Sequence, residues 1–127
     1  METILLVDDD PAILRLCQQI LRLDAYNVLT APSGEMALRV LQSNNNQVDL
    51  AVLDVMMPFM NGIELAGRIQ KANPDIPVVL MTGYGPAEIA RVVGENNPYR
   101  IIWKPFTSES LRRMVENVIS ASTGASA

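Results

Sequence analysis

The sequence predicts an α/β domain built on a doubly wound, mostly parallel sheet of five strands and five helices. Short apolar runs, typical of buried parallel strands, alternate with segments whose apolar residues recur at helical spacing. Polar residues also follow several of these runs, where a strand would reach the edge of the sheet. The length of 127 residues and the hydrophobic content of 49% suit one domain with a substantial core.

Each predicted strand is a short apolar run bounded by polar or turn-forming residues. The first run ends at three consecutive aspartates, the second lies shortly before Ser33, and the third ends at Asp54. The fourth run ends before Thr82 and the fifth before Lys104. The five predicted strands are residues 3–7, 27–30, 49–53, 77–81 and 99–103.

The predicted helices follow residues that commonly cap helix ends. Asp10 is a capping aspartate, and Pro11 stands at the first helical position. Ser33 precedes the second helix, and either Thr107 or Ser108 precedes the last one. The predicted helices cover 11 to about 23, 34 to the polar break at 44–46, the turn at 61–62 to about 72, about 86–94, and 107 or 108 to about 119.

Composition narrows the function classes. The net charge is −4 without a basic tract, so we expect no nucleic acid binding by this domain alone. No apolar run approaches the ~20 residues that span a bilayer, and no signal peptide precedes the first strand, so we expect no membrane contact and a cytoplasmic location. The single cysteine, Cys17, is expected to be a buried packing residue. We expect residues 1–120 to form the domain and residues 121–127 to be a flexible tail or the start of a linker.

The absence of histidine is equally informative. It excludes Ser/His and Cys/His catalytic pairs and imidazole metal ligands within this chain. If phosphohistidine chemistry is involved, the histidine must therefore lie on another protein.

Polar residues at the ends of four predicted strands are expected to meet in one crevice, because ligands bind beyond the carboxyl ends of parallel strands. These residues are Asp8, Asp9, Asp54, Thr82 and Lys104. Clustered carboxylates repel one another, so the site calls for a cation, and oxygen ligands favour Mg²⁺ or Ca²⁺. Asp10 is expected to cap the first helix rather than to join this cluster.

Four short motifs in this order resemble the receiver domain of two-component response regulators, from Ile4 to about Ile119. The motifs are Val7-Asp8-Asp9, Leu53-Asp54-Val55-Met56-Met57-Pro58 with Gly62 following, Met81-Thr82-Gly83, and Lys104-Pro105-Phe106. The resemblance implies a flavodoxin-like sheet with strand order 2-1-3-4-5. It also suggests a cis Lys104–Pro105 bond, and Gly62 is expected to permit a close turn beneath the site.

The resemblance implies a phosphoacceptor chemistry. Asp54 would take a phosphoryl group from a phosphohistidine on a sensor histidine kinase or a histidine phosphotransfer protein. Lys104 would pair with Asp54 at rest and with a phosphoryl oxygen afterwards, and the Thr82 hydroxyl would bond another phosphoryl oxygen. The Mg²⁺ ligands would be Asp8, Asp9, Asp54 and the backbone carbonyl of Met56.

Two positions depart from the family pattern. Ile101 stands where the family usually has an aromatic switch residue, and the aromatic residue here is Trp103. We expect these two side chains to share a face, with signalling through the surface of the fourth helix, fifth strand and fifth helix to an effector or a second copy. The alternative is a Trp103 packed beneath the fourth helix.

The lifetime of the phosphoryl group depends on the path of the attacking water. Met56 and Tyr84 are expected to border that path and to block it, which predicts slow self-dephosphorylation.

Two other functions compete with the phosphoacceptor. An aspartate-nucleophile phosphohydrolase typically carries a second aspartate two residues after the nucleophile, and Met56 occupies that position here. A degenerate receiver that acts only in protein binding is disfavoured by the complete set of five crevice residues. We therefore expect catalysis to be limited to the domain's own phosphorylation and dephosphorylation.

Overall fold

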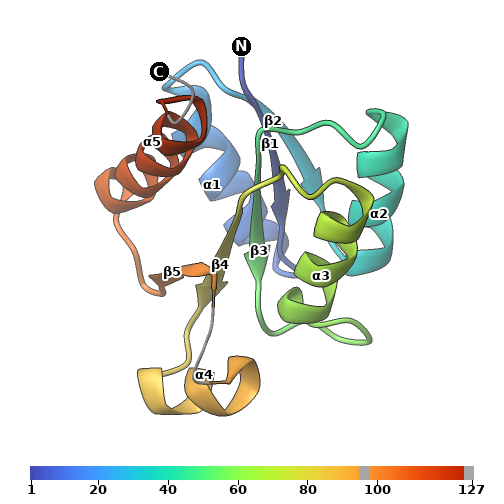
Figure 1. Cartoon of the computed structure of the whole chain (residues 1–127). Helices are drawn as coiled ribbons and strands as arrows, with labels where there is room; N and C mark the ends of the chain where they lie inside the picture. Colours follow the sequence, from blue (N-terminus) through green and yellow to red (C-terminus); the bar gives the residue numbers. More distant parts are fainter. Residues whose placement is uncertain (95–97, 125–127) are drawn as a thin grey trace.

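The computed structural model describes residues 1–94 and 98–124, which form one parallel five-stranded sheet covered by helices (Figure 1). The strand order is β2-β1-β3-β4-β5, and neighbouring strands pair in parallel. The strands are β1 (Thr3–Val7), β2 (Asn27–Ala31), β3 (Leu50–Asp54), β4 (Val78–Thr82) and β5 (Arg100–Trp103). The predicted fold class and strand order are confirmed.

The first three helices begin at residues whose side chains cap the helix, whereas α4 follows Gly85 without a side-chain cap. Asp10 accepts a hydrogen bond from the Ala12 N–H at 2.9 Å, as predicted for the first helix. Ser33 caps the second helix, and Asn61, which the sequence analysis did not single out, caps the third. The helices are α1 (Pro11–Arg22), α2 (Gly34–Ser43), α3 (Gly62–Ala72), α4 (Pro86–Val93) and α5 (Ser108–Gly124).

Side chains alternate along each strand and fill two cores, one on each face of the sheet. On one face, α1 and α5 pack over a core that includes Leu6, Val52 and Met81. On the other face, α2, α3 and α4 contribute to a core that includes Leu53 and Leu80. Figure 1 shows α1 and α5 on one side of the sheet and α2 and α3 on the other.

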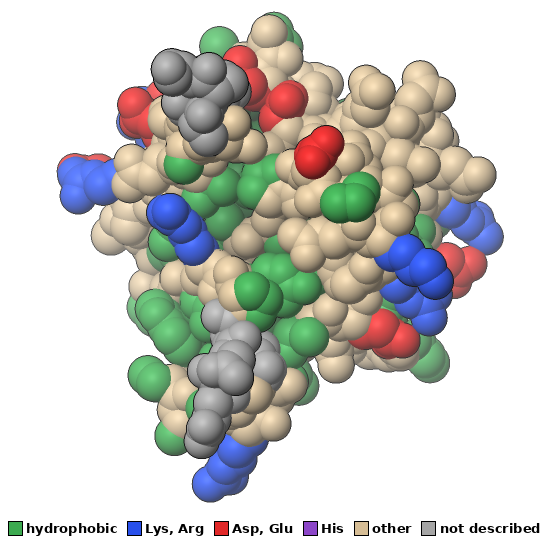
Figure 2. All heavy atoms as spheres, viewed as in Figure 1, with side chains coloured by type: hydrophobic (Ala, Val, Ile, Leu, Met, Phe, Trp, Pro, Cys, Tyr) green, Lys and Arg blue, Asp and Glu red, His purple; other side chains and the backbone are tan. Residues whose placement is uncertain are grey.

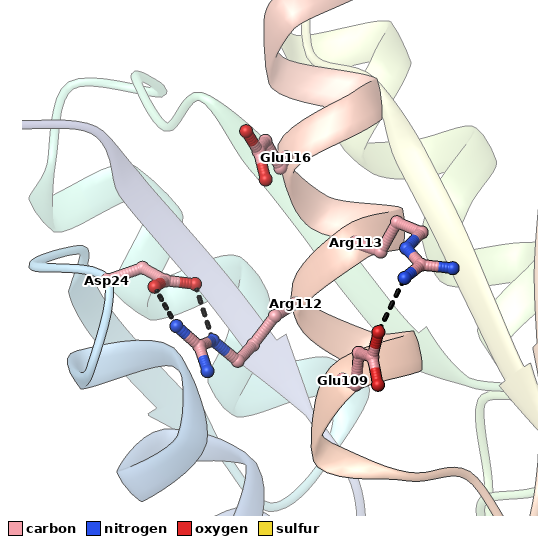
Figure 3. A pocket seen from close by; sticks show the side chains of 5 residues that line it. All are labelled: Asp24, Glu109, Arg112, Arg113 and Glu116. Atoms are coloured by element: carbon pink, nitrogen blue, oxygen red, sulfur yellow. Dashed lines mark hydrogen bonds and ion pairs between the residues drawn. The ribbon is translucent and has the colours of Figure 1, made fainter.

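An ion pair also links α5 to the segment that follows α1, at the end of the sheet opposite the carboxyl ends of the strands. Arg112 of α5 donates two hydrogen bonds to the Asp24 carboxylate, with N–O distances of 2.9 and 2.6 Å (Figure 3). This pairing lowers the pKa of the Asp24 carboxyl. Cys17 lies buried beneath the same layer, and burial raises the pKa of its thiol to about 11. It is a packing residue, as expected.

Several boundaries differ from the prediction. The third and fourth strands lie one residue later than expected, so Asp54 and Thr82 are the last residues of their strands. Helix α5 continues to Gly124, past the expected start of a tail at residue 121, and residues 125–127 lie outside the described part. The predicted fourth helix ends at Val93, because Gly94 has a φ of 83° and terminates it.

Candidate functional site

The strand ends bring the predicted residues together. β1 and β3 are neighbours, with Val7 paired to Leu53, so Asp8 and Asp54 leave the sheet side by side. Thr82 ends the next strand, and the Lys104 N–H donates to the Thr82 carbonyl at 2.7 Å. The crevice therefore lies where the strand order reverses between β1 and β3, as expected for a doubly wound sheet.

Three carboxylates form a compact cluster in this crevice. Asp8, Asp9 and Asp54 each place one carboxylate oxygen within 4.8 Å of the others. Asp8 is fully buried, Asp54 is 5% exposed, and Asp9 is exposed. Oxygen donors without imidazole or thiolate partners suit a hard cation such as Mg²⁺ or Ca²⁺. The cluster could hold a metal ion, and the contribution of the Met56 carbonyl stays a prediction.

Lys104 is shared between two carboxylates rather than paired with Asp54 alone. Its Nζ lies 3.0 Å from Asp8 Oδ2, with a hydrogen bond, and 3.5 Å from Asp54 Oδ1. The expected resting pair of Lys104 with Asp54 is thus the weaker of the two contacts. Burial opposes the charged form of Lys104, but the hydrogen bond from its ammonium to Asp8 and the charges of both carboxylates hold its pKa above the ordinary value.

Asp54 is less well compensated than its buried neighbour Asp8. Burial disfavours its charge, and with the neighbouring Asp8 it raises the pKa of Asp54 from 3.8 to about 6. Lys104 and the Met56 N–H, which donates to Asp54 Oδ1 at 3.4 Å, offset only part of this effect. Perturbed carboxyl groups of this kind are concentrated at functional sites.

Thr82 and two glycines shape the crevice around Asp54. The buried Thr82 hydroxyl accepts a hydrogen bond from the Tyr84 N–H at 2.9 Å. A Cβ at Gly83 would come no closer than 4.0 Å to the Lys104 Cβ, so the crevice stays open there. A Cβ at Gly62 would lie only 2.3 Å from the Asp54 carbonyl oxygen, which confirms the expected close turn. The Lys104–Pro105 bond is cis, as predicted.

The two residues at the expected switch position lie on one face of β5. Ile101 is half-buried against the core beneath α2, α3 and α4, whereas Ile102 points into the opposite core. Trp103 is 39% exposed, so it is not packed away beneath α4. Its part in signalling stays a prediction.

The two residues expected to control phosphoryl lifetime differ in exposure. Met56 is about half exposed, and Tyr84 is half-buried against the core beneath α2, α3 and α4. One residue near the site was missed by the sequence analysis. Phe59, in the loop after β3, is fully exposed and has a φ of 69°.

Comparison with known proteins gives a consistent result. Residues 4–116 match the family described as the response regulator receiver domain. The transcriptional regulatory protein GlrR of Escherichia coli (strain K12) is 35% identical over 122 residues, which cover 96% of this chain and 27% of GlrR. A CheY-like receiver domain protein from Methanospirillum hungatei JF-1 has a TM-score of 0.87 at 28% identity and covers 98% of both chains. The response regulator TrrA from Thermotoga maritima, solved in complex with Mg²⁺-BeF, has a TM-score of 0.77 at 32% identity, over 93% of this chain and 99% of TrrA.

The match reaches from the first strand into the last helix and includes the crevice residues. The chain spans 27% to 51% of the length of the curated relatives that it matches. Within residues 1–94 and 98–124, no helix combines the length and apolarity needed to cross a membrane. A parallel sheet in the order 2-1-3-4-5, an acidic cluster at its switch point, and a family match over residues 4–116 lead to one conclusion: the chain belongs to the response regulator receiver domain family of two-component signalling.

Proposed function

We propose that Asp54 accepts a phosphoryl group from a phosphohistidine on a sensor histidine kinase or a histidine phosphotransfer protein. In this reaction the phosphorus–nitrogen bond to histidine breaks, and a bond to an Asp54 carboxylate oxygen forms. The proposal is supported chiefly by the convergence of Asp54 with two further carboxylates within 4.8 Å and with the Lys104 ammonium at 3.5 Å.

The residues around Asp54 have complementary tasks in this proposal. Asp8, Asp9 and Asp54, with the Met56 carbonyl, would hold Mg²⁺, which neutralises charge on the transferring phosphoryl group when bound. Lys104 would move its ion pair from the carboxylates to a phosphoryl oxygen. The Thr82 hydroxyl oxygen accepts from the Tyr84 N–H, so its proton is free to be donated to another phosphoryl oxygen.

The output surface is proposed to be α4–β5–α5. Val92 of α4 and Trp103 of β5 are exposed, and Figure 2 shows hydrophobic side chains gathered over α4 and the neighbouring edge of the sheet. A downstream effector domain or a second copy of the receiver would bind there, with Ile101 beneath the surface in place of an aromatic switch residue. The net charge of −4 supports a protein partner rather than nucleic acid for this domain.

We further propose that residues 1–120 are the receiver and that residues 121–127, of which 121–124 extend α5, are a tail or linker start. The protein would be cytoplasmic, as is general for this family. The domain would act as a switch whose chemistry is limited to its own phosphorylation and slow dephosphorylation. The side chains of Met56 and Tyr84 would keep water from the phosphoryl group.

Incubation with acetyl phosphate and Mg²⁺, followed by intact-mass spectrometry, tests the proposal. We expect a stable mass increase of one phosphoryl group on the wild-type chain and none on Asp54→Asn. Asp75→Asn, which changes an exposed carboxylate in the loop before β4, is the matched control and should be phosphorylated normally. Continuous release of phosphate without an adduct would indicate a phosphohydrolase. No reaction would indicate a degenerate receiver that only binds proteins.

A further inference from the structure

Phe59 occupies a backbone conformation that bulky residues rarely adopt. Its φ is 69°, and the Met60 N–H donates to the Pro58 carbonyl at 2.8 Å, which closes a three-residue γ-turn around it. A γ-turn with a positive central φ is rare and strained, and a large side chain adds steric conflict that glycine would avoid. Strained residues of this kind are concentrated at functional sites.

The side chain of Phe59 points away from a firmly held loop. The loop comprises residues 55–61 between β3 and α3, and its inward residues include the buried Met57 and also Met60, which packs against Gly34 of α2. The Gly62 N–H donates to the Val55 carbonyl at 2.9 Å and closes the base of the loop. The ring itself is 105% exposed, so it gains no burial within this chain. A partner that covered the ring would supply that burial.

The position of the loop identifies which partner would cover it. The loop begins one residue after Asp54 and forms part of the rim of the crevice. A protein that brings a histidine to Asp54 comes close to this loop, because its first residue follows Asp54 directly in the chain. The α4–β5–α5 surface lies at the edge of the sheet, two strands away from β3, so an effector bound there has no need to reach Phe59.

We propose that Phe59 is the aromatic anchor by which the protein that donates the phosphoryl group binds this receiver. Its ring would enter an apolar pocket on the donor beside the phosphohistidine, and the exposed Met56 would extend the contact toward Asp54. This inference rests on the proposed phosphoacceptor function. It assigns Phe59 to binding of the donor protein and not to the phosphoryl-transfer chemistry.

Comparing a protein phosphodonor with acetyl phosphate separates donor binding from the phosphoryl-transfer chemistry, because acetyl phosphate needs no protein contact. The protein donor is a purified, phosphorylated histidine domain from a kinase of the same genome that encodes this receiver. Among these domains, the one that transfers its phosphoryl group fastest to the wild-type chain is used. For Phe59→Gly we expect kcat/KM with this donor to fall about tenfold or more, which corresponds to about 1.4 kcal/mol, while the acetyl phosphate rate stays within about twofold of wild type. Phe59→Tyr keeps the ring and should transfer nearly as fast as wild type.

Controls distinguish binding from folding. Leu23→Ala removes another exposed apolar side chain, at the opposite end of the sheet, and should leave transfer unchanged. Phe59→Gly should melt at or above the wild-type temperature, because glycine relieves the strained turn.

Each of the following results would overturn the inference. Unchanged transfer from the protein donor to Phe59→Gly would show that the ring does not bind it. An equal loss with acetyl phosphate would place the effect in the chemistry at Asp54. A change in sedimentation of Phe59→Gly with unchanged transfer would assign the ring to self-association. If the wild-type chain accepted no phosphoryl group from acetyl phosphate, the proposed function would fail, and this inference with it.

Discussion

Replacing Asp54 with asparagine should stabilise the metal-free domain at neutral pH. The pKa of the buried Asp54 is raised from 3.8 to about 6, so its ionisation costs the folded state about 3 kcal/mol at pH 7. Asparagine keeps the shape without the charge, but Lys104 then loses its 3.5 Å partner and keeps only Asp8. We therefore expect a net gain of about 1–2 kcal/mol. With an unfolding entropy of about 2.1 cal/mol/K per residue, this gain raises Tm by about 4–8 °C.

The stability difference between Asp54→Asn and wild type should depend on pH in a definite direction. Between the unfolded pKa of 3.8 and the folded pKa of about 6, the folded state binds a proton on Asp54 that the unfolded state has released. The stability of the wild-type domain therefore falls as the pH rises through this window. The difference in Tm between Asp54→Asn and wild type should reach its full size at about pH 7 and should disappear by about pH 4. Asp75→Asn, at an exposed position, should show no comparable gap.

Thermal melts followed by circular dichroism, in EDTA and in millimolar Mg²⁺, provide the assay. A cation at ten times its Kd would stabilise the wild-type domain by about 1.4 kcal/mol, and Asp54→Asn, with one ligand fewer, should gain less. If wild type and Asp54→Asn have the same Tm in EDTA at every pH, the buried charge of Asp54 does not destabilise the metal-free domain. If Mg²⁺ leaves the wild-type Tm unchanged, the three carboxylates do not form the expected cation site.

Three further predictions concern individual positions. Beryllofluoride with saturating Mg²⁺ should change Trp103 fluorescence, since this 39% exposed ring lies on the proposed output surface; an unchanged spectrum would show that it does not report the switch. Met56→Asn combined with Tyr84→Glu should speed loss of the phosphoryl group several-fold, measured by the decay of the phosphorylated mass, and loss from wild type within seconds would contradict the occlusion argument. Gly62→Ala should lower stability by about 1–3 kcal/mol in denaturant titrations, because its Cβ would lie 2.3 Å from the Asp54 carbonyl oxygen. Gly67→Ala is the control: it has open space and should gain up to about 1 kcal/mol, so equal effects at both glycines would refute the steric account.

The sequence predicted the features that depend on periodicity and local signals. Apolar runs placed the strands to within about one residue at most ends, and the parallel arrangement brought Asp8, Asp54 and Thr82 to one edge of the sheet. The helix caps at Asp10 and Ser33 were predicted from the residue types, and both side chains accept a hydrogen bond from a backbone N–H of the first helical turn. These features require only the identity of neighbouring residues in the chain.

Two features of the structure were not predicted. The γ-turn at Phe59 reflects how Met57 and Met60 anchor the loop on either side, which periodicity does not encode. The extension of α5 to Gly124 has a simpler cause. The residues after Ile119 are small and polar, and this composition led to the prediction of a tail. None of the residues between Ile119 and Gly124 is a glycine or proline, so nothing stops the helix before Gly124.

The uneven sharing of Lys104 also supports Asp54, rather than the buried Asp8, as the proposed nucleophile. Asp8 already uses both oxygens, because Oδ1 accepts the Asp10 N–H at 2.9 Å and Oδ2 accepts the Lys104 ammonium at 3.0 Å. Asp54 has only longer contacts, at 3.4 Å to the Met56 N–H and 3.5 Å to Lys104. Burial and the charge of Asp8 raise the pKa of Asp54, and these longer contacts offset only part of that rise, which leaves a more basic oxygen for attack on phosphorus. A chain in which Lys104 paired primarily with Asp54 would hold that oxygen in a stronger ion pair and would make it a weaker nucleophile.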